Sequence, residues 1–169
     1  MAANFNWYVL MEYAGNQPDA MQDWLEDVLS TGMAEDIVVA SNQKQERALW
    51  SIRDHFEGIT SRKLFFNYDI SLPITAMEQY LLDLESTIKT RWPDSEFYSF
   101  GHMGDGNLHL FIMPGIDDKS LKDVANDMVY RPLGDVGGSV SAEHGIGLEK
   151  KSWLGICRNS TEIEVMKRL

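Results

Sequence analysis

The chain has 169 residues, of which 44% are hydrophobic, and this suits one globular domain with a sizeable core. A formal net charge of −11 at pH 7 disfavours binding to nucleic acids and to anionic membrane surfaces. The single cysteine, Cys157, excludes an internal disulfide and a thiolate metal cluster. No apolar run approaches the roughly 20 residues of a membrane span, and the first residues do not resemble a signal peptide. We therefore expect a cytoplasmic protein, and peripheral association with a membrane stays compatible with the sequence.

Hydrophobic spacing predicts strands that alternate with helices. Runs rich in aromatic and β-branched residues predict strands at 5–14, 36–40, 64–72, 96–102, 107–113 and 137–142. Apolar residues at helical spacing predict helices at 18–31, 42–62, 75–91 and 118–133, with shorter ones from residues 144 and 161. In the first two helices, the residues expected to face inward are Met21, Trp24, Leu25, Val28, Leu29, Leu49, Ile52, Phe56 and Ile59.

The strands at 96–102 and 107–113 are too close in sequence for a parallel crossover, so they must pair antiparallel. Together with the intervening helices, this predicts an α+β fold, a ferredoxin-like antiparallel sheet covered by helices, in a single domain over 1–169. The chain starts almost within a strand pattern and stops inside a helical one. We therefore expect it to be part of a longer protein.

The stretch GHMGDGNLHL, residues 101–110, holds two histidines on either side of an Asp-Gly pair. Asp-Gly favours a two-residue hairpin turn, which would place His102 directly opposite His109 on one face. Two imidazoles so placed can reach one metal ion. Two alternatives stay open, namely that the histidines are ordinary polar strand residues and that the glycine-rich turn binds a phosphate.

A second cluster, GGSVSAEHGIGLEK at 137–150, places Glu143 and His144 where a short strand is expected to end. Glu143 can supply a third ligand, because two histidines and a carboxylate with an open position are typical of a catalytic metal site. It can equally complement the dipole of a helix N-terminus. Adjacent strand residues point to opposite faces, so His144 would be a free base unless the chain bends there.

These residues resemble the C-terminal domain of FAD-linked oxidases of the vanillyl-alcohol-oxidase/PCMH superfamily. That group includes D-lactate dehydrogenase, the glycolate oxidase flavoprotein subunit and D-2-hydroxyglutarate dehydrogenase. The motifs that carry the resemblance are GHMGDGNLH and GGSVSAEHGIGLEK, supported in the same chain order by YVLMEYAG, ALWSIRDHF and YDISLP.

The resemblance implies an FAD-dependent oxidoreductase that moves a hydride from the α-carbon of a D-2-hydroxy acid to FAD. It also implies that FAD is bound mainly by a separate N-terminal domain, which this chain lacks, and that this chain is the cap that supplies the substrate pocket. The chain alone would then be inactive. An electron acceptor would be a further partner, and a homodimer is compatible with the sequence.

By motif position, the resemblance implies that His102, His109 and Glu143 bind a divalent zinc, manganese or iron ion. It implies that His144 is the base and that Arg53 grips the substrate carboxylate, a role that suits a guanidinium fork. Without the resemblance, Arg53 would be a surface helix residue in a salt bridge. Asn107 is expected in contact with the ligands, although turn formation alone would explain it.

Relatives that act on 2-hydroxyglutarate carry a lysine before the Tyr-Asp pair, a threonine one turn after the arginine, and an asparagine two residues after the second histidine. Here those places hold Asn67, Glu57 and Phe111. We therefore expect a different 2-hydroxy acid as substrate, with Phe111 giving the pocket a more apolar wall. His55, the remaining histidine, is expected at the surface.

Two other classes of function stay open at this point. One is a stand-alone metal-binding regulatory module without catalytic activity. The other is a metallohydrolase that uses His144 as its base, although no residue set for a leaving group is visible in the sequence.

Overall fold

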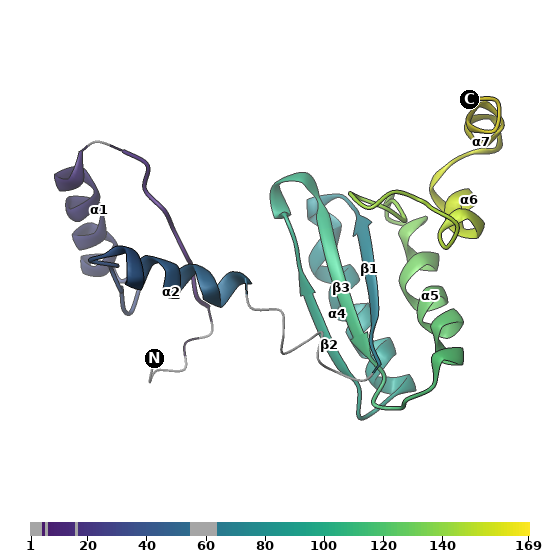
Figure 1. Ribbon diagram of the computed structural model, residues 1–169, viewed down its shortest axis with the longest axis horizontal. Coiled ribbons are helices and arrows are strands. Elements are labelled where there is room, and N and C mark those ends of the chain that lie inside the picture. Colours follow the sequence, from purple (N-terminus) through teal and green to yellow (C-terminus); the bar gives the residue numbers. More distant parts are fainter. Residues whose placement is uncertain (1–4, 6, 16, 55–63) are drawn as a thin grey trace. The chain divides into compact units, whose positions relative to one another are not determined.

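The computed structural model of the chain describes residues 5, 7–15, 17–54 and 64–169. It comprises two compact units, Met1–Glu57 and Gly58–Leu169, and each is described by itself (Figure 1). The expectation of a single domain over 1–169 stays a prediction. Among the described residues, no helix has the length and apolar composition needed to cross a membrane.

The first unit holds two helices, α1 (Pro18–Ser30) and α2 (Gln43–Asp54). Both were expected, and the predicted continuation of α2 beyond residue 54, with His55, Phe56, Glu57 and Ile59, lies outside the described residues. The strands expected at 5–14 and 36–40 are wrong, because the described residues there are not paired with any other strand. The expected inward faces are confirmed in part. Val28 is buried and Met21, Leu25 and Leu49 are half-buried, whereas Trp24, Leu29 and Ile52 are exposed.

The second unit is built on a three-stranded antiparallel sheet of order β1-β3-β2. Its elements are β1 (Phe66–Ser71), α4 (Ile74–Arg91), β2 (Glu96–Phe100), β3 (Asn107–Met113) and α5 (Lys122–Tyr130). A single antiparallel bridge joins Ser71 to Ser139 on the other side of β1. The strand expected at 137–142 is therefore reduced to one bridge beside β1. A full fourth strand at that edge would give the strand order 4-1-3-2. The structure confirms the α+β fold.

The core lies between this sheet and helices α4 and α5 (Figure 1). Alternate residues of β3, Leu108, Leu110 and Ile112, are buried against α4 and α5 because successive side chains of a strand point to opposite faces. The Tyr80 hydroxyl donates a 2.8 Å hydrogen bond to the carbonyl of Val129, which joins the two helices. The opposite face of the sheet is thus left for other residues.

Four 3-10 turns and two short helices complete the described part of this unit. The turns are Met103–Asp105, Lys119–Leu121, Arg131–Leu133 and Lys151–Trp153, and the helices are α6 (Leu154–Cys157) and α7 (Ser160–Met166). The helix predicted near residue 161 is confirmed as α7, and a capping box between Asn159 and Glu162 stabilises its first turn. The helix predicted from His144 is wrong, since helical structure resumes only at Lys151, after two glycines with positive φ at 145 and 147.

The hairpin that joins β2 to β3 differs from the predicted two-residue turn. Phe100 opposes His109, and His102 exchanges backbone hydrogen bonds with Asn107, so the loop spans four residues. Asp105 Oδ1 accepts a hydrogen bond from the N–H of Asn107, which stabilises this longer loop. The predicted opposition of His102 and His109 is therefore wrong. The register shift is two residues rather than one, so both histidines remain on the same face.

Gly106 closes this loop, and the site depends on it. Its φ is +76°, and an added Cβ would collide with the carbonyl oxygen of Leu72. We expect Gly106→Ala to lower the free energy of unfolding by more than about 1–2 kcal/mol, the cost of a left-handed backbone for an L-residue. The matched control is Gly104→Ala, because Gly104 has free space around it and no positive φ. That change should shift stability by less than about 1 kcal/mol. Urea unfolding checks both, and equal destabilisation would contradict this loop geometry.

Candidate active site

The sheet face opposite α4 and α5 carries the candidate residues in two adjacent rows. In one row Phe100, His109 and Asp69 lie side by side, because β3 pairs with both neighbours at His109. In the next row, Asn107 lies between His102 and Ser71. The register of β3 therefore gathers residues that are up to 40 positions apart in sequence on one small area.

The segment that follows Ser139 lies across the end of β1 and brings Glu143 and His144 to the same area. Backbone hydrogen bonds between Ser71 and Ser139 begin this crossing, with lengths of 3.1 and 2.6 Å. Gly145, with φ +78°, lets the chain turn away directly after His144. The sequence left open whether Glu143 and His144 point to opposite faces. Because the chain bends here, both side chains lie near His109.

Glu143 lies between the two histidines of the hairpin. Its Oε1 is 3.2 Å from Nδ1 of His102, and its Oε2 is 3.8 Å from Nε2 of His109. Ligand atoms around a tetrahedral zinc ion with bonds of about 2.0–2.1 Å are about 3.3–3.4 Å apart. The amide nitrogen of Asn107 donates a hydrogen bond to Oε1 of Glu143, so Asn107 contacts this carboxylate as expected. The donor types are those that zinc, manganese and iron take, but the two distances reach different oxygens of Glu143.

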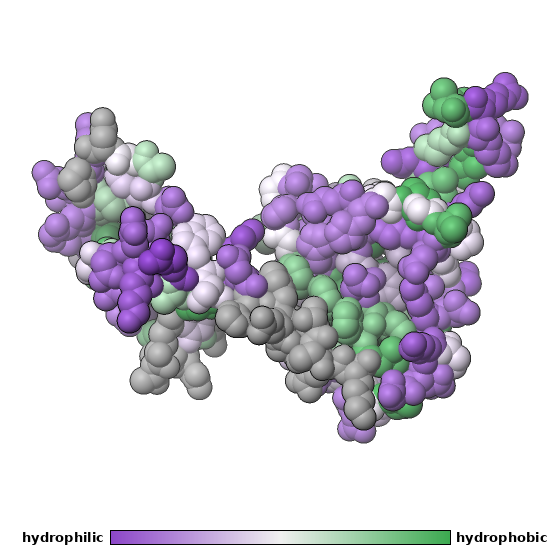
Figure 2. All heavy atoms as spheres, viewed as in Figure 1, coloured by the Kyte–Doolittle hydropathy of each residue, from purple (hydrophilic) through white to green (hydrophobic). Residues whose placement is uncertain are grey.

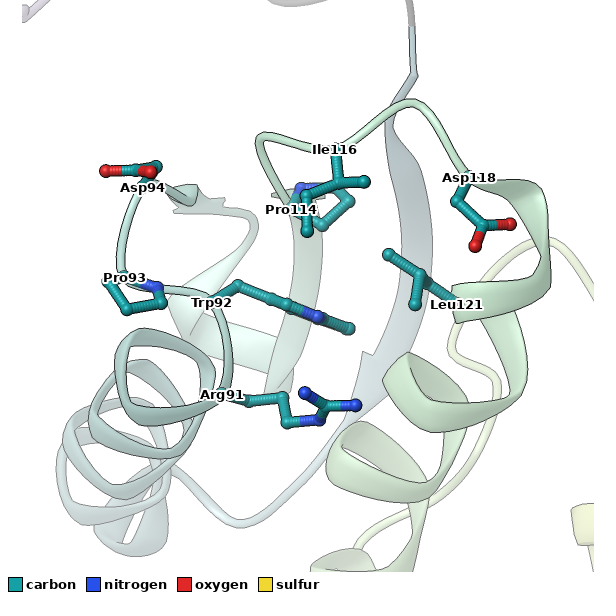
Figure 3. Close-up of a pocket in the computed structure, with 8 residues that line it drawn as sticks. All are labelled: Arg91, Trp92, Pro93, Asp94, Pro114, Ile116, Asp118 and Leu121. Atoms are coloured by element: carbon teal, nitrogen blue, oxygen red, sulfur yellow. The ribbon is translucent and has the colours of Figure 1, made fainter.

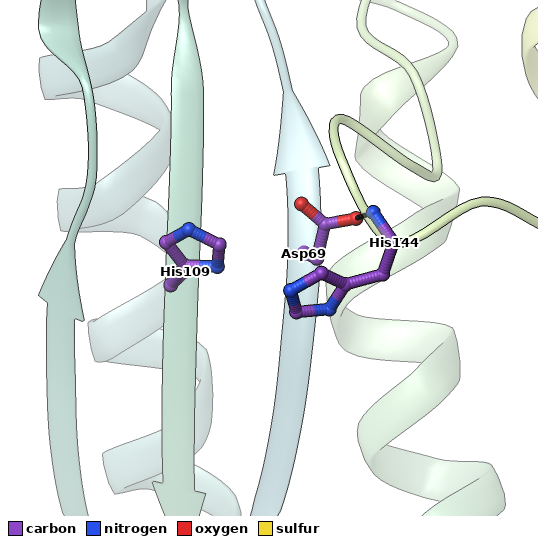
Figure 4. Close-up of side chains that lie close together, drawn as sticks. All are labelled: Asp69, His109 and His144. Carbon is purple, nitrogen blue, oxygen red and sulfur yellow. Dashed lines mark hydrogen bonds between the residues drawn. The ribbon is translucent and has the colours of Figure 1, made fainter.

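His144 lies beside His109, with 5.4 Å between the ring centroids. Asp69, His109 and His144 each offer one ligand atom, and these atoms lie within 4.8 Å of one another (Figure 4). Two carboxylates thus lie close to His109, those of Glu143 and Asp69. His144 is largely exposed to solvent, whereas Asp69 is 1% exposed.

The carboxylates of Asp69 and Glu143 differ in how many hydrogen bonds they accept. Asp69 accepts hydrogen bonds from the N–H groups of Ala142, Glu143 and His144. Burial alone would raise the pKa of Asp69, but the backbone donors of His144 and Glu143, with Lys150 and Ser141, hold that pKa well below its usual range. Both oxygens of Asp69 thus accept backbone hydrogen bonds, whereas Glu143 accepts a hydrogen bond from the amide of Asn107 on Oε1.

The remaining predicted site residues fall in two places. Phe111 lies on the same sheet face as His109 and stacks on Phe100 at 5.5 Å between ring centroids, and the ring centroid of Phe65 lies 5.6 Å from that of Phe111. Figure 2 shows apolar residues gathered on this face over the strands. Arg53 belongs to the first unit, where it pairs with Asp54 at 3.1 Å. That pairing is the surface role which the sequence left as its alternative, and the substrate role of Arg53 stays a prediction.

Sequence reasoning missed Asp69 and Lys150, which contact each other at 3.3 Å. The available signal was an aspartate in the middle of the strand pattern FNYDIS, between residues that are buried. Charged residues are almost never fully buried unless they are paired. An aspartate at that position therefore indicates a buried partner, but the sequence does not say which cation supplies it.

A separate pocket of about 240 Å³ lies at the other end of the sheet, after β3 (Figure 3). The ring of Trp92 lies across it, with Pro114 and Leu121 on one side and Arg91 on the other. No histidine or glutamate lines it. It holds two carboxylates, those of Asp94 and Asp118, but no imidazole, and we assign it no role.

The chain matches the family described as FAD linked oxidases, C-terminal domain, over residues 2–169. It is 33% identical to the mitochondrial D-2-hydroxyglutarate dehydrogenase of Rattus norvegicus over 168 residues, which cover 96% of this chain and 31% of that protein. It is 31% identical to the D-2-hydroxyglutarate dehydrogenase of Stutzerimonas stutzeri over 169 residues, which cover 95% of this chain and 36% of that protein. The chain thus spans about a third of the length of these curated relatives. It belongs to the FAD-linked oxidase C-terminal domain family.

The contact between Asn107 and Glu143 can be tested by an isosteric change. Asn107 is 2% exposed, so Asn107→Asp would press a buried carboxylate against that of Glu143. We expect the free energy of unfolding, measured at pH 7 with a chelator present, to fall by about 1.5–3 kcal/mol. The control is Asn67→Asp, the same change at an exposed position of β1, which should have little effect. Equal effects of the two changes would contradict the contact.

Proposed function

We propose that this chain is the substrate- and metal-binding cap domain of an FAD-dependent dehydrogenase that oxidises a D-2-hydroxy acid. The observation that carries the proposal is Glu143 held between His102 and His109, with His144 beside them. Family membership supports a flavin partner. The chain's share of its relatives' length supports a separate N-terminal domain that binds most of the FAD.

In this proposal His102, His109 and Glu143 hold a divalent zinc, manganese or iron ion. Imidazole and carboxylate ligands suit all three metals, so the donor set does not select among them. When bound, the ion would lower the pKa of the substrate hydroxyl, and the flavin would accept the hydride. Asn107 orients Glu143 through its hydrogen bond to Oε1.

His144 would take the hydroxyl proton on a ring nitrogen. Its position supports this role, because its backbone N–H is fixed by a 2.9 Å hydrogen bond to Asp69 while its side chain is exposed beside His109. A positioned base of this kind contributes about 10²–10⁴-fold to the rate of proton transfer. Arg53 is proposed to bind the substrate carboxylate, which a planar guanidinium can grip through two hydrogen bonds.

The substrate side chain is proposed to meet an apolar wall at Phe111. The ring stacks against Phe100 on the sheet face that holds His109, and neither ring can pair with a second carboxylate. We therefore propose a 2-hydroxy acid with an apolar side chain, although the relatives reported above are named for 2-hydroxyglutarate. The cytoplasmic location, the electron acceptor and a homodimer stay predictions.

Metal analysis of variants tests the central part of this proposal. We expect one equivalent of divalent metal in the protein that contains this domain, purified without a metal-affinity column. His109→Ala should lose it, because a ligand is removed. The matched change His144→Gln should keep the metal but lower kcat by about 10²–10⁴-fold. Loss of metal in both variants, or in neither, would contradict the assigned roles.

Substrate preference tests the role of Phe111. We expect the wild-type protein to have a higher kcat/KM for 2-hydroxyhexanoate than for 2-hydroxyglutarate. Phe111→Asn should lower this ratio by about 10-fold or more, because the apolar contact is lost and an amide can pair with the second carboxylate. Tyr98→Asn, at the facing position on β2, is the control. A wild-type preference for 2-hydroxyglutarate would overturn the proposed substrate class.

A further inference from the structure

We propose that Asp69 and Lys150 form a buried clasp that positions Glu143 and His144 over the sheet. They are positioning residues rather than ligands or bases. The roles of Glu143 and His144 as ligand and base rest on the proposed function. The positioning of the segment 141–144 by the clasp rests only on the contacts of Asp69 and Lys150.

Asp69 fixes the backbone of three consecutive residues. Its carboxylate accepts the N–H of Ala142 at 3.2 Å, of Glu143 at 3.0 Å and of His144 at 2.9 Å. Three successive donors that converge on one carboxylate determine the direction of the chain at that point. Asp69 is itself fixed, because it lies within β1 directly opposite His109. The clasp therefore links the placement of Glu143 and His144 to the strand that carries His109.

Lys150 closes the clasp from the far end of the loop. Its ammonium group lies 3.3 Å from Oδ2 of Asp69, 2.9 Å from the backbone carbonyl of Asp69 and 3.0 Å from Oγ of Ser141. The side chain of Lys150 is 13% exposed. The hydroxyl of Ser141 also lies 3.0 Å from Oδ2 of Asp69 and 2.9 Å from the carbonyl of Gly145. All three ammonium protons thus have an acceptor.

The charge of the clasp also matters to the site. Asp69 places a negative charge beside His109, and Lys150 balances it without offering a lone pair to any ion. A buried ion pair is weak evidence for stability, because desolvation offsets much of the attraction. The consequence that the contacts support is geometric: the pair orients Glu143 and His144, which lie in a loop without regular secondary structure.

A competing interpretation makes Asp69 a metal ligand, since one of its oxygens lies within 4.8 Å of donor atoms of His109 and His144. Lys150 separates the two interpretations. A lysine that contacts Asp69 and Ser141 is not itself a ligand, so changing it removes no donor from the ion. If Asp69 served as a ligand, removing Lys150 would free a carboxylate oxygen and strengthen metal binding. If Asp69 instead positions the segment, removing Lys150 should weaken metal binding.

The test compares Lys150→Met with Lys122→Met in the full-length protein. Lys122 pairs with Glu149 at 2.9 Å on the surface, so its replacement is a matched control. We expect Lys150→Met to speed amide hydrogen exchange at residues 142–144 by about tenfold or more, with β3 unchanged. Zinc affinity, titrated with Zn²⁺ alone, should fall by about 10–100-fold. At saturating zinc, kcat should fall by about tenfold while KM changes by less than twofold.

The inference would be overturned if Lys150→Met kept the wild-type exchange rates at residues 142–144 and the wild-type affinity for zinc. Tighter zinc binding by Lys150→Met would favour Asp69 as a ligand. A wild-type protein that binds no zinc and oxidises no 2-hydroxy acid would instead overturn the proposed function. The exchange rates would still decide whether the clasp holds the segment. Asp69→Asn is the second variant, expected to give a larger effect in the same direction on exchange.

Discussion

The antiparallel register of β3 between β1 and β2 is the constraint on which the rest of the structure depends. It directs Leu108, Leu110 and Ile112 into the core, and it turns Asn107 and His109 to the opposite face. A slip of one residue on either side would exchange these two sets of side chains. The hydrophobic core therefore specifies the position of the candidate site, since the burial of three apolar residues and the placement of the imidazole on the opposite face are two results of one pairing.

The candidate site joins this rigid strand to a loop that has almost no regular structure. Glu143 and His144 reside in a segment held by one bridge to β1 and by donors that converge on Asp69. One part of the site thus comes from a paired strand and the other from a loop, an arrangement typical of sites in which a scaffold positions a loop. The proposed chemistry needs both parts, because the two histidines come from the hairpin while the carboxylate and the base come from the loop.

Much of this could be predicted from residues alone. The glycine-rich motifs indicated the two histidines and the Glu-His pair, and the helical periodicities located α1, α4, α5 and α7 within a few residues. The turn was mispredicted because Asp-Gly favours a two-residue loop, whereas the Asp105 side chain supports a longer one here. The strands at 5–14 and 36–40 failed since a strand pattern does not reveal whether a partner exists. The partnership of Asp69 with Lys150 spans 81 positions, and no local pattern encodes it.

Anomalous diffraction from crystals of the full-length protein, collected at the absorption edge of the bound metal, tests the central claim most directly. We predict one ion bound by Nδ1 of His102, Nε2 of His109 and a carboxylate oxygen of Glu143, at about 2.0–2.2 Å. We also predict that Asp69 keeps its backbone hydrogen bonds and does not bind the ion. An ion bound instead by Asp69, or no ion at the histidine cluster in crystals grown with added Zn²⁺ or Mn²⁺, would contradict the account.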